Sequence, residues 1–214
     1  MKKVLLLFLT TMLAFTGGCG MTKEKDNGKV EQQYMPETEA FKDEFTREFI
    51  KSAEETEEGY YTFESKTKGY TMLFPENAKV SKSDYELHEN KYETLNLGEK
   101  ISDINNSYYI KLTYEKSPNI NDIDVHLDQL SITSGYKGEF KEIDNGTNIV
   151  YYARENNNEK GLFYYIALIK ANNTDQLIRL TFDSSCSNGE TECDVDADKL
   201  EQRLMEVVNS IKFK

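Results

Sequence analysis

The sequence predicts an α+β fold, in which a mainly antiparallel sheet carries packed helices, one of them at the C-terminus. From residue 59 onward, apolar and polar residues alternate in segments separated by Asn, Asp and Gly turns, a pattern typical of strands. Two stretches, 121–132 and 196–211, instead carry apolar residues at helical spacing. Strands with a few packed helices form a single α+β domain, which is expected over residues 59–214.

The alternating segments are rich in tyrosine, isoleucine, leucine and threonine, which fit a half-buried strand. Asn145-Gly146 and the run Asn156-Asn157-Asn158 have the chemistry of hairpin turns, which join antiparallel neighbours. The predicted strands are residues 60–63, 70–74, 85–97, 108–114, 139–143, 148–154, 162–170 and 176–182.

The two helical stretches direct their apolar residues to one side. In residues 121–132, the inward residues are expected to be Ile123, Leu127 and Leu130. Asp194 or Asp196 can cap the last helix. The residues of that helix at core spacing are Leu200, Leu204, Val207, Val208 and Ile211.

An amphipathic helix is predicted ahead of this domain, over residues 37–58. Thr38 can cap it, and Phe41, Phe45 and Phe49 recur every four residues opposite an acidic face. Two interpretations stay open. The phenylalanine stripe packs against the same domain, or it docks onto a partner or the membrane interface, although the acidic residues weaken the membrane version.

The first residues predict export from the cytoplasm. Lys2 and Lys3 precede an apolar run over residues 4–15, and small residues follow, which are the three parts of a signal peptide. The run is too short for a helix that spans a bilayer, which needs about 20 residues. Residues 1–18 are therefore expected to be a signal peptide.

The end of this segment, Thr16-Gly17-Gly18-Cys19, resembles the lipobox of bacterial lipoproteins, although leucine is usual where Thr16 stands. The resemblance implies that Cys19 receives a diacylglycerol and becomes the N-terminus of the mature chain. Two acyl chains hold a protein stably on a membrane. The expected location is the outer, extracytoplasmic face of the cell membrane; the alternative is a plain signal peptide with an incidental cysteine. Residues 19–36 are then the lipidated cysteine and a polar tether that reaches roughly 20 to 25 Å.

The chain is strongly acidic, with a formal net charge of −12 that becomes −14 once Lys2 and Lys3 are removed. Phosphate binding needs clustered lysine and arginine, so no nucleic-acid partner is expected. The charge serves solubility and separation from an anionic envelope, or alternatively matches a basic partner.

Two cysteines remain besides Cys19, and in an exported protein Cys186 and Cys193 are expected to form a disulfide. The loop between them has a turn at Asn188-Gly189, and its closure stabilises the fold by about 2 kcal/mol. Two reduced thiols are the alternative. The spacing is not C-x-x-C, which argues against a redox-active pair.

Neither histidine predicts a metal site, because His88 and His126 lack ligand spacing to each other or to cysteine; both are expected at the surface. Asp194-Val195-Asp196-Ala197-Asp198 is similar to the start of a calcium loop, but lysine and methionine occupy the positions of its glycine and closing glutamate. Helix capping explains these aspartates better.

No motif of an enzyme stands out. The sequence contains no Gly-rich phosphate loop, no G-x-S-x-G elbow and no H-E-x-x-H pattern, and abundant carboxylates alone do not predict a glycosidase. No catalytic residue, metal ligand or cofactor is therefore expected.

Tyrosine is frequent, with 14 residues, several of them in adjacent pairs. Neighbours on a strand point to opposite faces, so one member of each pair is expected in the core and the other on the outer face, where it is available for recognition. The alternative is simple strand preference, and the absence of tryptophan weakens sugar stacking. The pairs are Tyr60-Tyr61, Tyr108-Tyr109, Tyr151-Tyr152 and Tyr164-Tyr165.

Gly69-Tyr70-Thr71-Met72-Leu73-Phe74-Pro75, the antiparallel middle and the ending Ser210-Ile211-Lys212-Phe213 resemble the PsbP-like fold over about residues 60–214. The resemblance implies a structure and no catalytic residues. Three functions stay open: a non-catalytic domain that binds an envelope protein or component, an envelope hydrolase with an unidentified carboxylate site, and an accessory subunit that docks on a membrane complex through its phenylalanine helix.

Overall fold

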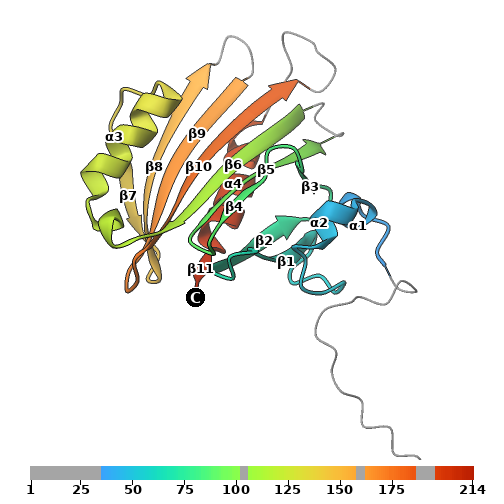
Figure 1. Ribbon diagram of the computed structural model, residues 1–214. Coiled ribbons are helices and arrows are strands. Elements are labelled where there is room, and N and C mark those ends of the chain that lie inside the picture. Colours follow the sequence, from blue (N-terminus) through green and yellow to red (C-terminus); the bar gives the residue numbers. More distant parts are fainter. Residues whose placement is uncertain (1–34, 102–105, 158–161, 187–195) are drawn as a thin grey trace, which may run out of the picture.

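The structure, a computed structural model, describes residues 35–101, 106–157, 162–186 and 196–214. Its main feature is an eight-stranded sheet with the order β3-β5-β6-β10-β9-β8-β7, in which β4 also pairs with β5 (Figure 1). All of its pairings are antiparallel. The strands are β3 (Lys79–Val80), β4 (Glu86–His88), β5 (Tyr92–Ile101), β6 (Asn106–Lys116), β7 (Lys141–Asp144), β8 (Asn148–Asn157), β9 (Leu162–Ala171) and β10 (Gln176–Cys186).

A second, three-stranded sheet joins the first strands of the domain to the last one. Its order is β1-β2-β11, so that β2 has an early neighbour on one side and the end of the chain on the other. The backbone N–H of Lys214 adds a hydrogen bond to the carbonyl of Gly69 at 2.9 Å. The strands are β1 (Tyr60–Glu64), β2 (Tyr70–Pro75) and β11 (Lys212–Phe213).

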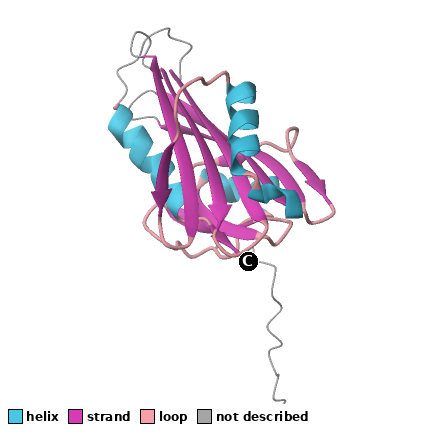
Figure 2. Ribbon diagram, turned by 90° about the vertical axis from the view of Figure 1, so that its left-hand side faces the viewer, coloured by secondary structure: helices cyan, strands magenta, loops and turns pink. Residues whose placement is uncertain are grey.

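Helices cover both faces of the large sheet (Figure 2). On β9, Ile166 belongs to a small core under α3, whereas its neighbours Tyr165 and Ala167 belong to the main core with α4. Since neighbours on a strand point to opposite faces, α3 and α4 lie on opposite sides of the sheet. The helices are α1 (Glu39–Lys42), α2 (Glu44–Arg47), α3 (Ile123–Ser134) and α4 (Ala197–Asn209), with the 3₁₀ helix η3 (Pro118–Asn121) before α3.

The expected α+β class is confirmed, since antiparallel sheets dominate and a few helices pack on them. Helix α4 follows its sequence pattern closely: the backbone N–H of Lys199 donates to the Asp196 carboxylate at 3.2 Å, as expected of a cap. Its predicted core residues, Leu200, Leu204, Val207, Val208 and Ile211, are all buried.

The predicted strand over residues 85–97 is wrong in its middle. Glu89 and Asn90 have φ values of 48° and 56°, and this left-handed pair turns the chain between β4 and β5. Of the two predicted turns, Asn145-Gly146 joins β7 to β8 as expected, with Gly146 at a φ of 86°. The other predicted turn reaches Asn158, which lies outside the described residues. No described helix combines the length and the apolar character that crossing a bilayer requires.

The single helix predicted over residues 37–58 is also wrong. Asp43, with an extended backbone at φ −86° and ψ 119°, ends α1 and caps α2 by accepting the backbone N–H of Thr46 at 2.7 Å. Beyond α2, the backbone of Ile50 bridges to Phe63 of β1. The segment therefore joins the small sheet and shares the core of the domain, and the expected domain boundary at residue 59 does not separate them.

Candidate binding groove

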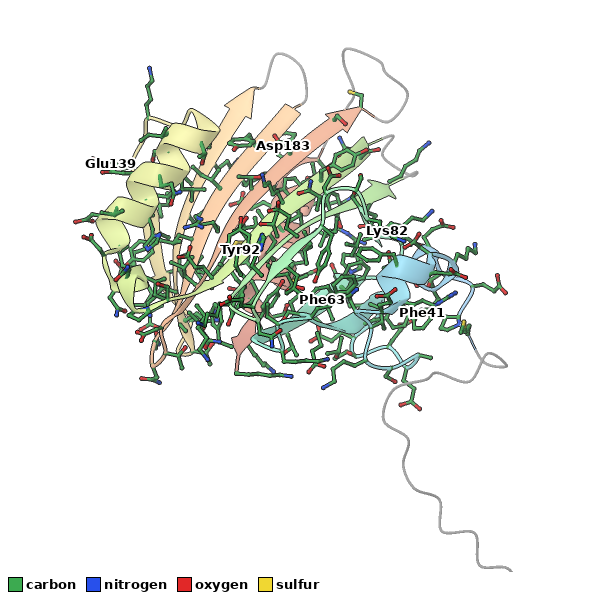
Figure 3. All side chains as sticks on the ribbon, viewed as in Figure 1. Phe41, Phe63, Lys82, Tyr92, Glu139 and Asp183 are labelled. Atoms are coloured by element: carbon green, nitrogen blue, oxygen red, sulfur yellow. The ribbon has the colours of Figure 1, made fainter. Side chains whose placement is uncertain are left out.

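A surface groove of about 1440 Å³ follows the end of the large sheet that lies nearest to α1 and α2. Glu39 of α1 and Asp43 line one end of it, and β3 lies alongside. At the other end it crosses β5, β6 and β10, where Lys111 and Asp183 belong to its lining. Figure 3 shows Asp183 on β10, on the side of the fold away from the labelled Phe63 of the small sheet.

The groove crosses a part of the outer sheet face that no described helix covers. Helix α3 packs over β8 and β9, where the small core lies. Towards β5 the same face carries Asn96, Lys111 and Thr181, which the strand register places in one row. The next row holds Gly98, Tyr109 and Asp183. The face is therefore apolar where α3 covers it and polar where it is open to solvent, as expected for a sheet face that one helix covers only in part.

Tyr109 provides an exposed aromatic surface in this groove. Its side chain is 60 % exposed, and its register partner on β5 is Gly98. A Cβ atom at position 98 would lie only 2.8 Å from Cε1 of the tyrosine ring. Glycine therefore allows the ring to lie over the neighbouring strand.

The lining also reaches around the strand edge to the side of the sheet that α4 covers, where it includes a buried ion pair between the large sheet and α4. Arg203 donates from Nε to Oε2 of Glu99 at 2.8 Å and from Nη2 to Oε1 at 2.6 Å. Glu99 is only 5 % exposed, and the hydroxyl of Tyr108 donates a further hydrogen bond to it. Burial and the negative charge of Glu99 raise the pKa of Tyr108 well above its usual value. The carboxylate of Glu99 is therefore fully engaged by Arg203 and Tyr108 and is not free to act as a general acid or base.

Arg203 also touches the small sheet. Its guanidinium carbon lies 5.5 Å from the ring centroid of Tyr60, within the range of a cation–π contact. The hydroxyl of Tyr60 in turn donates to Glu206, one turn further along α4, at 2.5 Å. The pair thus fixes α4 between both sheets.

Negative charge exceeds positive charge along the groove, whose lining includes seven carboxylates and four lysine or arginine side chains. Glu39 is bridged by Lys79 at 2.6 Å, and Glu99 by Arg203. Removing these two pairs leaves five carboxylates against Lys100 and Lys111. The groove is consequently electronegative on balance. The five are Asp43, Glu58, Glu76, Asp84 and Asp183.

The predicted covalent sites fall largely outside the described residues. Cys19, the expected lipid attachment site, and Cys193 both lie there. Cys186 ends β10 and is 9 % exposed. The disulfide between Cys186 and Cys193 remains a prediction.

The expectation of two surface histidines is wrong for one of them. His88 is exposed on β4, but His126 is only 8 % exposed because α3 presses it onto the sheet. There Nη1 of Arg179 lies 3.1 Å from its Nδ1, and Arg179 also bonds to Glu115 at 3.0 Å. Within the described ranges, no three histidine, cysteine or carboxylate side chains are grouped to hold a metal ion. Asp196 serves as a helix cap.

Three tyrosine pairs divide between the faces as predicted: Tyr108, Tyr152 and Tyr165 are buried, and their neighbours are more exposed. The pair Tyr60-Tyr61 differs, since both are buried. β1 is covered on both faces, by α4 on one and by Phe41 on the other, whose ring lies 4.9 Å from that of Tyr61.

Sequence reasoning missed Glu99, Arg203 and Gly98. The only available signal was Gly98, since a glycine inside a strand often marks a close approach of another group. The pairing of Glu99 with Arg203 joins residues 104 positions apart and leaves no local pattern.

The sequence is similar to known proteins over almost its whole length. Residues 36–212 match the model of a family, YvcA_Mog1p, described as "Putative lipoprotein YvcA". A Bacillus subtilis (strain 168) protein of the same description is 29 % identical over 234 residues, which cover 100 % of this chain and 97 % of that protein.

Among solved structures, a crystal structure from Bacteroides thetaiotaomicron VPI-5482 at 1.50 Å aligns with a TM-score of 0.39 and 16 % identity. The alignment covers 72 % of this chain and 48 % of that one, so this chain spans about half of that protein. Such a likeness is too weak to assign the fold. The match of the family model, by contrast, extends over both sheets, the groove and α4, and the chain belongs to the YvcA lipoprotein family.

Proposed function

We propose that this protein is anchored through a lipid on Cys19 to the outer face of the cell membrane, where its domain binds an envelope protein without catalysis. Residues 1–18 serve as the signal peptide and residues 19–36 as the lipidated cysteine and tether. The description of the family as lipoproteins supports the anchor. The two antiparallel sheets and the closing helix are in keeping with a PsbP-like domain, which remains part of this proposal.

The observation that carries a binding function is the groove beneath the exposed ring of Tyr109. Aromatic side chains that are held open on a rigid sheet are common anchors of protein interfaces. The most deeply buried carboxylate of the groove, Glu99, is engaged by Arg203 and Tyr108, which does not favour the hydrolase alternative.

Docking through the phenylalanine stripe has little support. Phe41 is 2 % exposed and Phe49 is 1 % exposed, so both are already packed against the domain. The groove, in contrast, lies beside the segment that leads to the tether, because Glu39 at its end is only four residues from Met35, the first described residue.

A photocrosslinking experiment in native membranes tests this function. Tyr109→p-benzoylphenylalanine should capture a specific membrane or envelope protein on irradiation. Ile132→p-benzoylphenylalanine is the matched control, because Ile132 is 82 % exposed on α3 and lies away from the groove. Capture from position 132 alone, or from neither position, would contradict the proposal.

The anchor has its own test. Cys19→Ala should leave an uncleaved precursor or release the protein from the membrane fraction. A variant that is cut at the same bond and stays membrane-bound would show that the lipid assignment is wrong.

A further inference from the structure

The geometry of the groove points to its ligand: we propose that it accepts an extended peptide segment, bearing lysine or arginine, from the partner protein. This inference rests on the proposed binding function and deepens it. Three features carry it: the charge of the lining, the open edge of β5, and the position of the groove beside the segment that leads to the tether.

The charges favour a cationic occupant. Asp84 is exposed, and its carboxylate accepts hydrogen bonds from the hydroxyls of Ser81 at 2.5 Å and Ser83 at 3.3 Å. The Ser81 hydrogen bond and, to a smaller extent, the charge of Lys111 lower its pKa, so Asp84 is ionised and its main partners are neutral hydroxyls. Asp183 is exposed in the row of Tyr109. Since the lining carboxylates outside the two ion pairs outnumber Lys100 and Lys111 by five to two, an incoming lysine or arginine gains more than an acidic group does.

Tyr109 and Asp183 together form a suitable subsite for one cation. They are direct register partners on β6 and β10, so their side chains project from the same face at neighbouring positions. A lysine or arginine side chain can then lie on the ring face while its charge meets the carboxylate. Each contact alone is weak at the surface, on the order of 1 kcal/mol, but the two act on the same group.

The edge of β5 favours an extended backbone. β3 pairs with β5 only at Gly98 and Leu97, and the backbone N–H of Ser81 adds a hydrogen bond to the carbonyl of Asn96 at 2.8 Å. Backbone groups of antiparallel strands point alternately to either side, so Lys100 directs its N–H and C=O to the same side as Asn96 and Gly98. In the described part of the chain, no strand pairs with Lys100 on that side, and the residue lines the groove. A peptide strand can add there, in continuation of β3.

The position of the groove limits where the partner lies. Its α1 end is lined by Glu39, four residues from Met35, the first described residue, and the proposed tether leads from there to the proposed lipid anchor. A partner that occupies the groove therefore presents its basic segment close to the outer membrane surface. An integral membrane protein with a basic extracytoplasmic segment has this chemistry and this place.

The test uses the full-length lipidated chain in detergent and a fluorescein-labelled peptide of eight alternating lysine and threonine residues. Asp84→Asn/Asp183→Asn should weaken the binding of this peptide at least fivefold. Asp124→Asn/Asp128→Asn on the exposed side of α3 changes the net charge equally and should leave the binding within twofold of wild type. Hydrogen exchange at residues 99–101 should slow in the complex.

Equal losses in both double variants, equal binding of a glutamate-threonine peptide, or unchanged exchange at residues 99–101 would overturn the inference. Its failure is separable from that of the binding function. If crosslinking from position 109 captures a partner while the peptide test fails, the groove is a binding site of different chemistry. If crosslinking also fails, the proposed function is wrong as well.

Discussion

The ammonium group of Lys66 lies 4.5 Å from the ring centroid of Phe45. The rings of Phe49 and Tyr85 surround the same group at 4.6 and 5.2 Å, and Glu48 binds it at 2.5 Å. Phe45 and Phe49 come from the segment before the small sheet, whereas Lys66 follows β1. The phenylalanine stripe therefore finds its partners within its own domain, and several predictions rest on this packing.

Phe49→Ala should lower the free energy of unfolding by about 3 to 5 kcal/mol, because it deletes a buried aromatic ring. This ring is stacked on that of Phe63, with 5.2 Å between the ring centroids. Phe45→Ala should cost less, since Phe45 is only half-buried. Urea unfolding of the full chain measures both. Ile132→Ala, at an exposed position, should have almost no effect, and an unchanged stability of Phe49→Ala would show that the segment is not part of the core.

Lys66→Met keeps the aliphatic stem but removes the charge from the aromatic rings. It should destabilise the domain by about 1 kcal/mol, the usual contribution of a partly exposed cation–π contact. A double-mutant cycle with Phe45→Ala isolates the contact, and the two losses should add to more than the loss of the double variant. Strict additivity would mean that ring and cation do not interact.

Glu93→Gln should raise stability at neutral and alkaline pH. Glu93 is 0 % exposed, and burial raises its pKa above the ordinary value of 4.5, although the backbone N–H of Lys66 and the hydroxyl of Tyr85 donate to it, each at 2.9 Å. A raised carboxyl pKa means that the folded state binds the proton more tightly. The wild type therefore loses stability, relative to the variant, as the pH rises from 4.5 through the raised pKa.

Thermal unfolding at a series of pH values checks this difference between wild type and Glu93→Gln. The two proteins should converge in their pH dependence below pH 4.5, where the carboxyl is protonated in both folded and unfolded chains. If the wild type instead became more stable relative to Glu93→Gln as the pH rises, the prediction would be contradicted.

Arg203→Met should destabilise the domain by about 3 to 5 kcal/mol, because it leaves the buried charge of Glu99 without a cation. Adding Glu99→Gln to this variant should restore part of the loss, since the orphaned charge is then gone. Chemical unfolding of the two variants gives the comparison. A double variant that is no more stable than Arg203→Met would mean that the charge of Glu99 is not the cause.

Cys186 and Cys193 should resist alkylation in the native protein until a reductant is added. Intact-mass measurement counts the modified thiols before and after reduction. Opening the loop should cost about 2 kcal/mol on the chain-entropy model. Ready alkylation of both cysteines without reductant would exclude the bond.

The fold was predictable where a local pattern agreed with its surroundings. Leu200, Leu204 and Val207 repeat at helical spacing, and Asp196 caps them, so α4 could be located closely. The segment over residues 37–58 has an equally regular stripe, but Asp43 satisfies the N–H of Thr46 and interrupts the helix. The path of this segment then depends on tertiary contacts of the phenylalanines with β1 and Lys66, which cannot be inferred from a local sequence pattern.

The groove was less predictable than the fold. Alternation predicted that one of Tyr108 and Tyr109 lies on the outer face, and the structure shows that it is Tyr109. Which part of that face stays open depends on where α3 packs and on the short pairing of β3 with β5. These are long-range arrangements, as is the contact between Glu99 and Arg203.

The order β1-β2-β11 makes the completion of the small sheet depend on the last strand of the chain. Residues 60–75 cannot complete their sheet until Lys212 and Phe213, almost the last residues of the chain, are available to pair. Contacts of such long sequence separation form slowly during folding. A chain that lacks its final few residues therefore cannot complete the small sheet, so the first and last strands of the domain reach their final order together, after the whole sequence is present.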